Sequence, residues 1–577
     1  MYLSKRLQMP DQFENPLQWE ETRQTRSNQK TSLVMSTQES ISKSNCLGRS
    51  IFIPHYDNLY MLPVEPIRFM SPTAMTRHLL LLCVPAWGHI RPGLNYAIEL
   101  LKEASHLTIT FPISFNWIED FNGEIAKYDL DESVRSRLRV VPIGHVVPTE
   151  SVLLTFIQAL PPFCADIIGS TPYHQANGDV LPPINPPDVC LVHYIFWEPF
   201  CAIRKLNPKI PIIALSLAGT SATIRLTGPE ELGGIGDIAT KVELIAKETG
   251  KTVDEVYSTT EFYVQEEGKV INLIGLPPIY DYEFHMEHTP LVKAASKLLP
   301  KMYNFFRDCD GVLTSTARVV EPESNGAFKA YCERTGRSYY IAGPVAFPST
   351  EQRSEDGDAI VDFLDRIKRE RGERSVILVA FGSLFWPVNI DASWKVIEII
   401  HEKGIPMILA HSDKKVPMPE SLRAKLQASK NVIVKAWVPQ NVILGHPVTG
   451  WFLTHCGENS LMESLSHGIP MIAWPIQGDQ LANAMYVGKL KHNVGYELLE
   501  VFGPNSSKPL HRGYTPRGTI EAVEEEIETV LQNAFGLDGE EKRRNAEAFK
   551  EEISHLWDAD GEARLELRRF IKDYIPV

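Results

Sequence analysis

Features that mark several common functional classes are missing from this chain of 577 residues. No apolar run reaches the length of about 20 residues that a membrane-spanning helix needs, and "HLLLLCV" at residues 78–84 indicates a strand instead. The eight cysteines are scattered, with no Cys-x-x-Cys pair and no His–Cys metal spacing. A net charge of −14 argues against nucleic acid and anionic membranes as partners. We therefore expect a cytoplasmic protein with reduced cysteines, no stable membrane anchor and no nucleic-acid partner.

The chain is too long for one hydrophobic core, which predicts two or three domains. Residues 1–75 are polar, rich in Ser, Thr and Gln and without periodicity, so we expect a disordered N-terminal extension there. This segment also lacks the continuous apolar core of a secretory signal.

The most informative stretch covers residues 437–480, "WVPQNVILGHPVTGWFLTHCGENSLMESLSHGIPMIAWPIQGDQ". The apolar residues 450–454 predict a short buried strand, and a helix is expected from Glu458 to the glycine at position 468. A helix that starts directly after a strand presents unpaired N–H groups and a positive dipole end, which suit a phosphate. His455, Asn459 and Ser460 add side-chain donors at this helix start.

The same stretch offers groups for the rest of a nucleotide sugar. Glu463 lies one helical turn after Asn459, where its carboxylate could accept both hydroxyls of a ribose. Trp437 could stack on a flat base, and Asp479 with Gln480 could bind sugar hydroxyls. Each residue alone has a plainer explanation in packing, helix capping or a solvated surface. Only the whole set, in this order, favours a nucleotide-sugar site.

The stretch resembles the donor-binding signature of the UDP-dependent glycosyltransferases of the plant secondary-product type. "WVPQ", "THCGENS", the following Glu, "GIP" and "GDQ" all stand at that family's positions without a gap. The resemblance implies that Trp437 stacks on uracil with Gln440 beside it, that Glu463 binds the ribose, and that Asp479 and Gln480 bind the sugar. The diphosphate would meet His455, Asn459 and Ser460, and the full set of implied donor-binding residues also includes Ser383, Val438 and Gly457. One position departs, because Glu458 replaces the family's usual Trp.

The first ordered segment predicts a strand, a turn and a helix, followed by the strand "HLTITF", as in the βαβ unit of a doubly wound sheet. His89 stands in the turn, within "PAWGHIRP". On spacing alone it could cap the helix. The resemblance instead implies a general base, because the family carries its base in a "GH-x-x-P" loop, and a His pKa near neutral suits that task.

The family pairs this base with an Asp at the end of the third main strand, but the aligned residue here is His193. A neutral imidazole cannot stabilise a charged His89 as a carboxylate does. Three alternatives stay open: a weaker orienting group at His193, another acid, or slow catalysis. Asp188 is expected at the other end of the strand, and Glu198 would need a shifted alignment.

We predict two Rossmann-like doubly wound α/β domains that face each other across a cleft, the GT-B arrangement. The predicted parts are the extension 1–75, an acceptor-binding domain at 76–345, a linker at 346–358, a UDP-sugar-binding domain at 359–550, and a C-terminal helix at 551–577 that packs back on the first domain. Ser383, in the "FGS" turn that opens the second domain, would approach the diphosphate by resemblance.

The predicted function is inverting transfer of a hexose, with glucose favoured, from a UDP-sugar to a hydroxyl of a small lipophilic acceptor. We expect no cofactor and no metal, because a helix N-terminus can neutralise the diphosphate, and we expect a monomer. Two alternatives remain: a UDP-sugar-binding protein with weak or lost catalysis, and a nucleotide-sugar epimerase of similar fold.

Overall fold

A computed structural model describes residues 76–148, 151–175, 178–258, 267–284, 292–345, 355–383, 386–501 and 507–577. Every structural statement below concerns these ranges. The predicted N-terminal extension, residues 1–75, and most of the predicted linker lie outside them.

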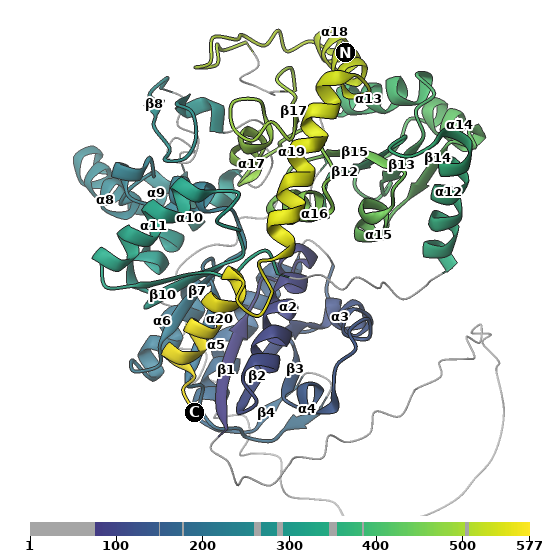
Figure 1. Ribbon diagram of the computed structural model, residues 1–577. Coiled ribbons are helices and arrows are strands. Elements are labelled where there is room, and N and C mark those ends of the chain that lie inside the picture. Colours follow the sequence, from purple (N-terminus) through teal and green to yellow (C-terminus); the bar gives the residue numbers. More distant parts are fainter. Residues whose placement is uncertain are drawn as a thin grey trace, which may run out of the picture. The chain divides into compact units, whose positions relative to one another are not determined.

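Seven parallel strands form the first sheet, in the order β11-β10-β7-β6-β1-β2-β3 (Figure 1). The strands are β1 Arg77–Leu82, β2 Leu107–Ser114, β3 Leu138–Ile143, β6 Val189–His193, β7 Ile212–Ser216, β10 Gly311–Thr314 and β11 Ser338–Ile341. They are apolar along nearly their whole length because helices cover both faces of a parallel sheet. In β1, Leu80 and Leu82 pack into one core and Leu79 and Leu81 into another, as the alternation of side chains along a strand requires.

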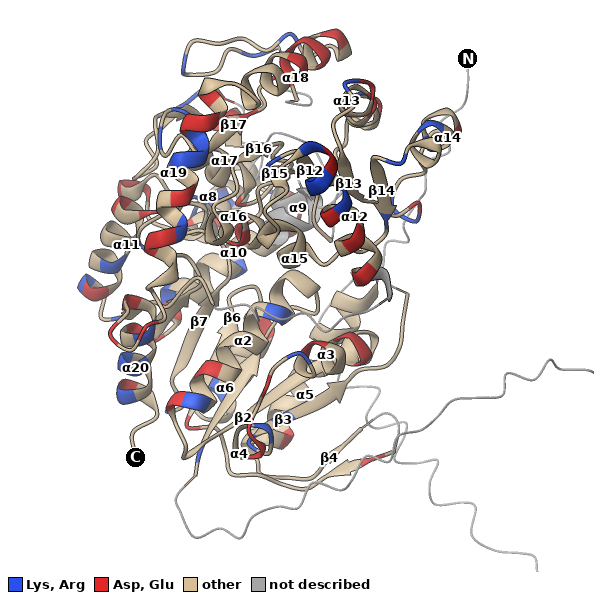
Figure 2. Ribbon diagram, turned by 45° about the vertical axis from the view of Figure 1, so that its right-hand side comes forward, with Lys and Arg blue, Asp and Glu red and all other residues tan. Residues whose placement is uncertain are grey.

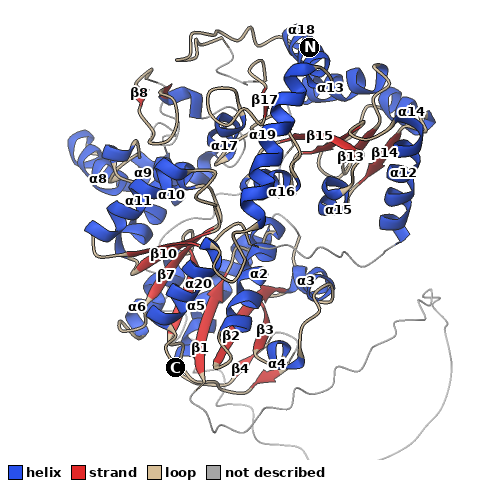
Figure 3. Ribbon diagram, in the orientation of Figure 1, coloured by secondary structure: helices blue, strands red, loops and turns tan. Residues whose placement is uncertain are grey.

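The second sheet has six parallel strands in the order β14-β13-β12-β15-β16-β17. These strands are β12 Val376–Ala380, β13 Met407–Ala410, β14 Val432–Lys435, β15 Thr449–Thr454, β16 Met471–Ala473 and β17 Gly495–Glu497. Figure 3 shows the two sheets flanked by helices. Two short hairpins, β4 Tyr173–His174 with β5 Val180–Leu181 and β8 Val270–Ile271 with β9 Ile279–Tyr280, are the antiparallel pairs of the described chain. The predicted pair of doubly wound α/β units is thereby confirmed.

Helices connect the strands of both sheets. The α-helices of the first domain are α2 Trp87–Glu103, α3 Ile118–Ile125, α4 Glu132–Arg135, α5 Val152–Ile168, α6 Trp197–Leu206, α7 Thr220–Thr227, α8 Ile238–Thr249, α9 Val253–Ser258, α10 Val292–Asp308 and α11 Pro322–Arg334. The later ones are α12 Glu355–Arg371, α13 Ile390–Glu402, α14 Glu420–Ala428, α15 Gln440–Gly445, α16 Glu458–His467, α17 Gln480–Val487, α18 Ile520–Ala534, α19 Leu537–Ser554 and α20 Glu562–Tyr574. Figure 2 shows acidic and basic residues interspersed along the ribbons of these helices. None of the described helices combines the length and apolar character needed to span a bilayer.

Each sheet reverses its winding direction beside its first strand. In the first sheet β2 and β3 extend one side of β1, and β6 pairs with the other side. In the second sheet β13 and β14 extend one side of β12, and β15 pairs with the other. A crevice opens beyond the carboxyl ends of the strands at such a reversal, and it is the usual ligand site of doubly wound sheets. The segments that follow β1, β6, β12 and β15 are therefore where a site is expected.

The predicted linker is longer than the structure allows. Residues 355–358, assigned to the linker from their polar composition, form the first turn of α12. Ile360, Leu364 and Ile367 form an apolar stripe on α12 that is fully buried. The packing of this stripe stabilises the helix, which therefore includes the polar residues 355–358 at its start.

The last helix, α20, packs against the first domain. Leu567 and Phe570 are fully buried in the core formed by one face of the first sheet. Around this apolar contact, the Arg564 and Arg568 guanidiniums pair with the Glu103 carboxylate at the end of α2. The chain thus leaves the second domain and returns to the first.

This packing predicts that truncating Phe570 destabilises the protein. Phe570→Ala should lower the free energy of unfolding by about 3–5 kcal/mol, because it removes a buried aromatic ring and leaves a cavity. Urea unfolding followed by circular dichroism would measure the change. Phe535→Ala is the matched control, since Phe535 is 49% exposed and should cost little. Equal unfolding midpoints for the two variants would contradict the docking of α20.

Candidate functional site

The predicted phosphate-binding helix start is present as α16, directly after β15. Gly457 precedes its first residue in an extended conformation, and Gly468 ends it with a φ of 70°, which glycine adopts without strain. Asn459 and Ser460 both lie in the first turn, so the side chains predicted to bind phosphate are next to the free backbone N–H groups.

His455 lies in the turn between β15 and α16, pressed between two glycines. A Cβ atom on Gly382 would lie 2.6 Å from His455 Nε2, and one on Gly457 would lie 2.7 Å from it. Gly382 also has a φ of 74°, in the left-handed region. Burial, together with the nearby Lys415 charge, lowers the pKa of His455 to about 4. The imidazole is therefore neutral at pH 7.

Lys415 is a cation near His455 that was not predicted from the sequence. Its Nζ donates to the Gly382 carbonyl oxygen at 2.9 Å, beside the exposed Ser383 that was predicted to approach the diphosphate. Desolvation by the surrounding chain lowers the pKa of Lys415 to about 8. The only signal in the sequence is a Lys-Lys pair in the loop after β13, which by itself is an ordinary solvated loop.

The predicted base-stacking residue, Trp437, is 63% exposed, so its ring can accept a planar partner. Its edge meets the Trp87 ring of the first domain, with the ring centroids 6.2 Å apart. Val438 is buried behind it, and Gln440 begins α15. The Gln440 side chain donates from Nε2 to Glu463 Oε2 at 2.5 Å.

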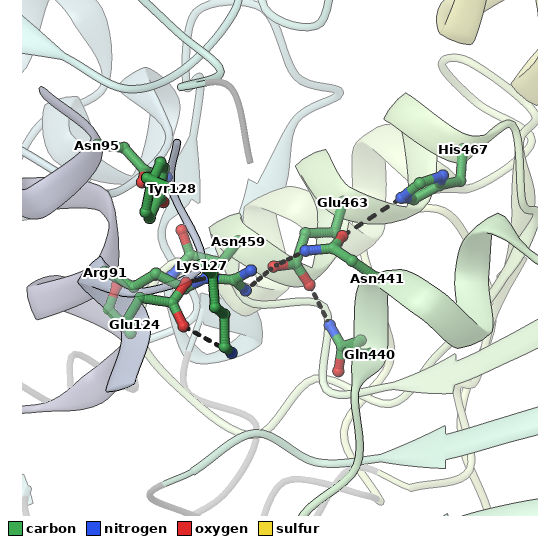
Figure 4. Close-up of polar contacts among 11 residues, drawn as sticks. Arg91, Asn95, Glu124, Lys127, Tyr128, Gln440, Asn441, Asn459, Glu463 and His467 are labelled. Atoms are coloured by element: carbon green, nitrogen blue, oxygen red, sulfur yellow. Dashed lines mark hydrogen bonds and ion pairs between the residues drawn. The ribbon is translucent and has the colours of Figure 1, made fainter. Parts of the chain in front are cut away.

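Glu463, the predicted ribose carboxylate, stands at the centre of a polar network that joins the two domains (Figure 4). The Arg91 Nη1 atom of α2 lies 3.1 Å from Glu463 Oε1. The same guanidinium donates from Nε to Glu124 Oε1 at 2.8 Å, and Lys127 Nζ lies 2.9 Å from Glu124 Oε2. Burial alone would lower the pKa of Arg91, but the Glu463 and Glu124 carboxylates outweigh it and raise this pKa. Arg91 was not among the predicted site residues.

A second polar contact joins the same two helices. Asn459 Nδ2 donates to the Gly88 carbonyl oxygen at 2.6 Å, one residue before His89. Two donor-site residues that lie one turn apart on α16 thus contact the start of α2. The predicted donor site and the loop of the predicted base are therefore adjacent.

His89 and His193 also lie together, at the winding reversal of the first sheet. Their ring centroids are 4.8 Å apart, with His89 at the start of α2 and His193 at the end of β6. Burial lowers the pKa of His89 to about 4. Burial and the neighbouring His89 lower the pKa of His193 well below its usual value. His89 Nδ1 and His193 Nε2 are buried without a hydrogen-bond partner among the described residues.

The two acids considered as partners for His89 are engaged elsewhere. Asp188 precedes β6 at the opposite end, where its carboxylate accepts from the His78 N–H at 2.8 Å and from Arg77 at 2.9 Å. Glu198 pairs with Lys301 on the surface of α6 and α10. His193 is thus the ring beside His89.

The predicted sugar-binding residues are largely tied to the local chain. Asp479 Oδ2 accepts from the Glu458 N–H at 2.8 Å, and burial raises the pKa of Asp479 to about 6. Gln480 Oε1 accepts from two backbone N–H groups, those of Ile476 and Gln477.

Glu458, the departure from the family pattern, is 4% exposed, and neither carboxylate oxygen has a hydrogen-bond partner among the described residues. Burial and the negative charges of Glu321 and Asp479 raise the pKa of Glu458 well above its usual value.

Comparison with known proteins agrees with this geometry. The family model for "UDP-glucoronosyl and UDP-glucosyl transferase" matches residues 358–501, which include α16 and its neighbours. UDP-glycosyltransferase eriJ of Hericium erinaceus is 27% identical, over 83% of this chain and 95% of that protein. Zeatin O-xylosyltransferase of Phaseolus vulgaris is 25% identical, over 68% of this chain and 83% of its own. The second domain thus matches the UDP-glycosyltransferase family model, and the chain as a whole is similar to UDP-glycosyltransferases.

Solved structures of UDP-glycosyltransferases share the fold. A transferase from Siraitia grosvenorii in complex with UDP has a TM-score of 0.62 at 19% identity, and it covers 87% of this chain and 100% of its own. Phytolacca americana UGT2 has a TM-score of 0.61 at 17% identity, and it covers 86% and 100%. As a UDP-glycosyltransferase, the protein is an enzyme that transfers a glycosyl group from a UDP-sugar.

Within the described ranges, burial and not a carboxylate shifts the pKa of His89, and this predicts how that pKa responds to an added carboxylate. In His193→Asp the pKa of His89 should rise by about 1–3 units, because an opposite charge within reach stabilises the imidazolium. NMR titration of the His89 ring, assigned with His89→Gln, would measure this. His193→Asn is the control, since it is as polar and of similar size but carries no charge. An equal His89 pKa in the Asp and Asn variants would contradict the proposed adjacency.

Proposed function

We propose that this UDP-glycosyltransferase moves a hexose, with glucose favoured, from a UDP-sugar to a hydroxyl of a small lipophilic acceptor, with inversion at the anomeric carbon. His89 is the general base, and His193 is the residue beside it. The donor binds the second domain through Trp437, Val438, Gln440 and Glu463, with Ser383, His455, Gly457, Asn459 and Ser460 at the diphosphate and Asp479 and Gln480 at the sugar.

The observation that carries this proposal is the contact between Asn459 and the Gly88 carbonyl oxygen, 2.6 Å long. It joins the predicted diphosphate-binding turn of α16 to the residue before His89. A base on the first domain and a leaving group on the second are then within reach of one reacting carbon. Proximity of this kind is a large part of what an enzyme contributes to a bimolecular reaction.

The proposed step is a direct displacement. His89 accepts the proton of the acceptor hydroxyl while that oxygen forms a bond to the anomeric carbon. The bond from this carbon to the diphosphate oxygen breaks on the opposite face, and its electron pair leaves with UDP. The transition state is oxocarbenium-like, as in glycoside hydrolysis, and a single displacement inverts the configuration.

The charge of the departing diphosphate falls among donors of the second domain. The backbone N–H groups of the first turn of α16 that follow Glu458, and the dipole of that helix, favour an anion there. Lys415 adds a positive charge near His455. These groups can stabilise the leaving group without a metal. In the described chain, no group of three or more His, Cys, Asp or Glu side chains is arranged to bind one.

An apolar acceptor is supported by the loop beyond the carboxyl end of β3. Val146 is 72% exposed, and Leu153 and Leu154 at the start of α5 are 37% and 48% exposed. The carboxyl ends of the strands of a doubly wound sheet face its ligand crevice. Exposed aliphatic side chains at this edge suit an aromatic or aliphatic alcohol better than a charged acceptor.

A second candidate function rests on the His89–His193 pair. Position 193 carries a histidine instead of an aspartate, so no negative charge at this position stabilises the protonated form of His89. With a pKa of about 4, His89 is a weak base. A protein that binds UDP-sugars with little or no transfer would have this arrangement.

We also propose a monomeric enzyme of the cytosol. The predicted base and the donor residues come from one chain, so one copy can hold both substrates. The seven cysteines of the described chain are free thiols, which suits a reducing compartment.

Incubation of the purified protein with UDP-glucose and a panel of phenols and alcohols tests the reaction. We expect UDP release matched by glucosides of the added mass, with a β-anomeric proton by NMR. His89→Ala should lose about 100-fold or more in turnover while UDP affinity by calorimetry is retained, because base catalysis contributes that much. His555→Ala, on the surface of the molecule, should behave as wild type. UDP binding without any product would favour the second candidate function.

Metal independence gives a separate prediction. Turnover in excess EDTA should equal turnover without it, because the helix dipole, the backbone N–H groups and Lys415 offset the diphosphate charge. Initial rates measured at several EDTA concentrations would check this. Loss of activity that added magnesium restores would refute it.

A further inference from the structure

The ion pair between Arg91 and Glu463 involves the predicted ribose carboxylate, yet the predicted donor site does not account for Arg91. Glu463 is 4% exposed, and a carboxylate in such surroundings is costly to keep ionised without an opposite charge. Arg91 supplies that charge at 3.1 Å from the other domain. Gln440 donates to the second carboxylate oxygen, so both oxygens have fixed donors.

Arg91 is itself held in one orientation. Its Nε donates to Glu124 Oε1 at 2.8 Å, and Glu124, which is 2% exposed, is further neutralised by Lys127. The planar guanidinium thus bridges two buried carboxylates, Glu124 in the first domain and Glu463 in the second. A lysine has one nitrogen and cannot reach both in the same way.

We propose that Arg91 is a positioning residue for the donor: it keeps the Glu463 carboxylate ionised and oriented toward the ribose hydroxyls. Hydrogen bonds to an ionised acceptor are about twice as strong as those to a neutral one, and each carboxylate oxygen can accept more than one donor. This inference rests on the proposed donor site. It adds to that site a residue of the opposite domain, so donor affinity depends on both halves of the molecule.

The consequence falls on donor binding rather than on the chemical step. Arg91 lies two residues after His89 on α2, and 200° of helical rotation turns it away from the His89–His193 pair. Its loss should therefore raise the donor KM by about tenfold, as expected for one charge-assisted contact, while kcat changes much less. A residue with only a structural role would not separate the two constants in this way.

Calorimetric titration with UDP and with 2′-deoxy-UDP tests the proposal. The wild type should prefer UDP, and Arg91→Met should lose both affinity for UDP and most of this preference, because the ribose contact is weakened. Arg91→Lys should fall between the two. Lys127→Met is the matched control: it removes a cation from the same network without contact to Glu463, and it should leave the preference intact. The ratio of the two dissociation constants does not depend on the fraction of a variant that folds.

The outcomes separate this inference from the donor site itself. If UDP binds the wild type and Glu463→Ala equally, the donor-site assignment is wrong and the role of Arg91 falls with it. If Glu463→Ala weakens UDP binding but Arg91→Met keeps the affinity and the preference for UDP, only the role of Arg91 is refuted. Tighter binding of UDP to Arg91→Met would also refute it, since Arg91 would then compete with the ribose.

Discussion

Parallel strands deliver all their carboxyl ends to one edge of a sheet, and the loops that follow them have no other place to lie. In both sheets the winding reverses beside the first strand, between β1 and β6 and between β12 and β15. In the first sheet, the predicted base His89 follows β1 and His193 ends β6. In the second sheet, Ser383 follows β12 and His455 follows β15. One topological constraint, used twice, thus brings together residues that are hundreds of positions apart in sequence.

The two sides of the site treat buried charge differently. On the side of the first domain, His89 and His193 are desolvated beside each other with no carboxylate, so both favour the neutral form. Where the first domain meets the second, Arg91 and Glu124 of the first domain and Glu463 of the second are also largely buried, but they pair with one another. Glu458 resembles the histidines, because burial and negative neighbours favour its protonated form. Charge is thus retained around the predicted ribose carboxylate and is disfavoured around the predicted base.

Much of the fold could be predicted from the sequence because it depends on local patterns. The strand and helix around His89 and the start of α16 at Glu458 follow from apolar runs, glycines and spacing. The neighbour of His89 also followed from the alignment, since His193 ends β6. Arg91 could not be predicted, because its partner Glu463 lies 372 residues away and the contact exists only when the domains meet. The start of α12 was missed because its apolar stripe lies beyond a polar first turn.

The glycines at 382 and 457 leave room for the His455 ring that no residue with a side chain would leave. The His455 ring occupies the space that a Cβ atom at either position would need, with its Nε2 within 2.7 Å of both. Any larger residue at either position would push the imidazole out of line, and at Gly382 it would also strain the backbone. Attempts to evolve a different donor preference will therefore have to leave this space untouched and vary the rim around it.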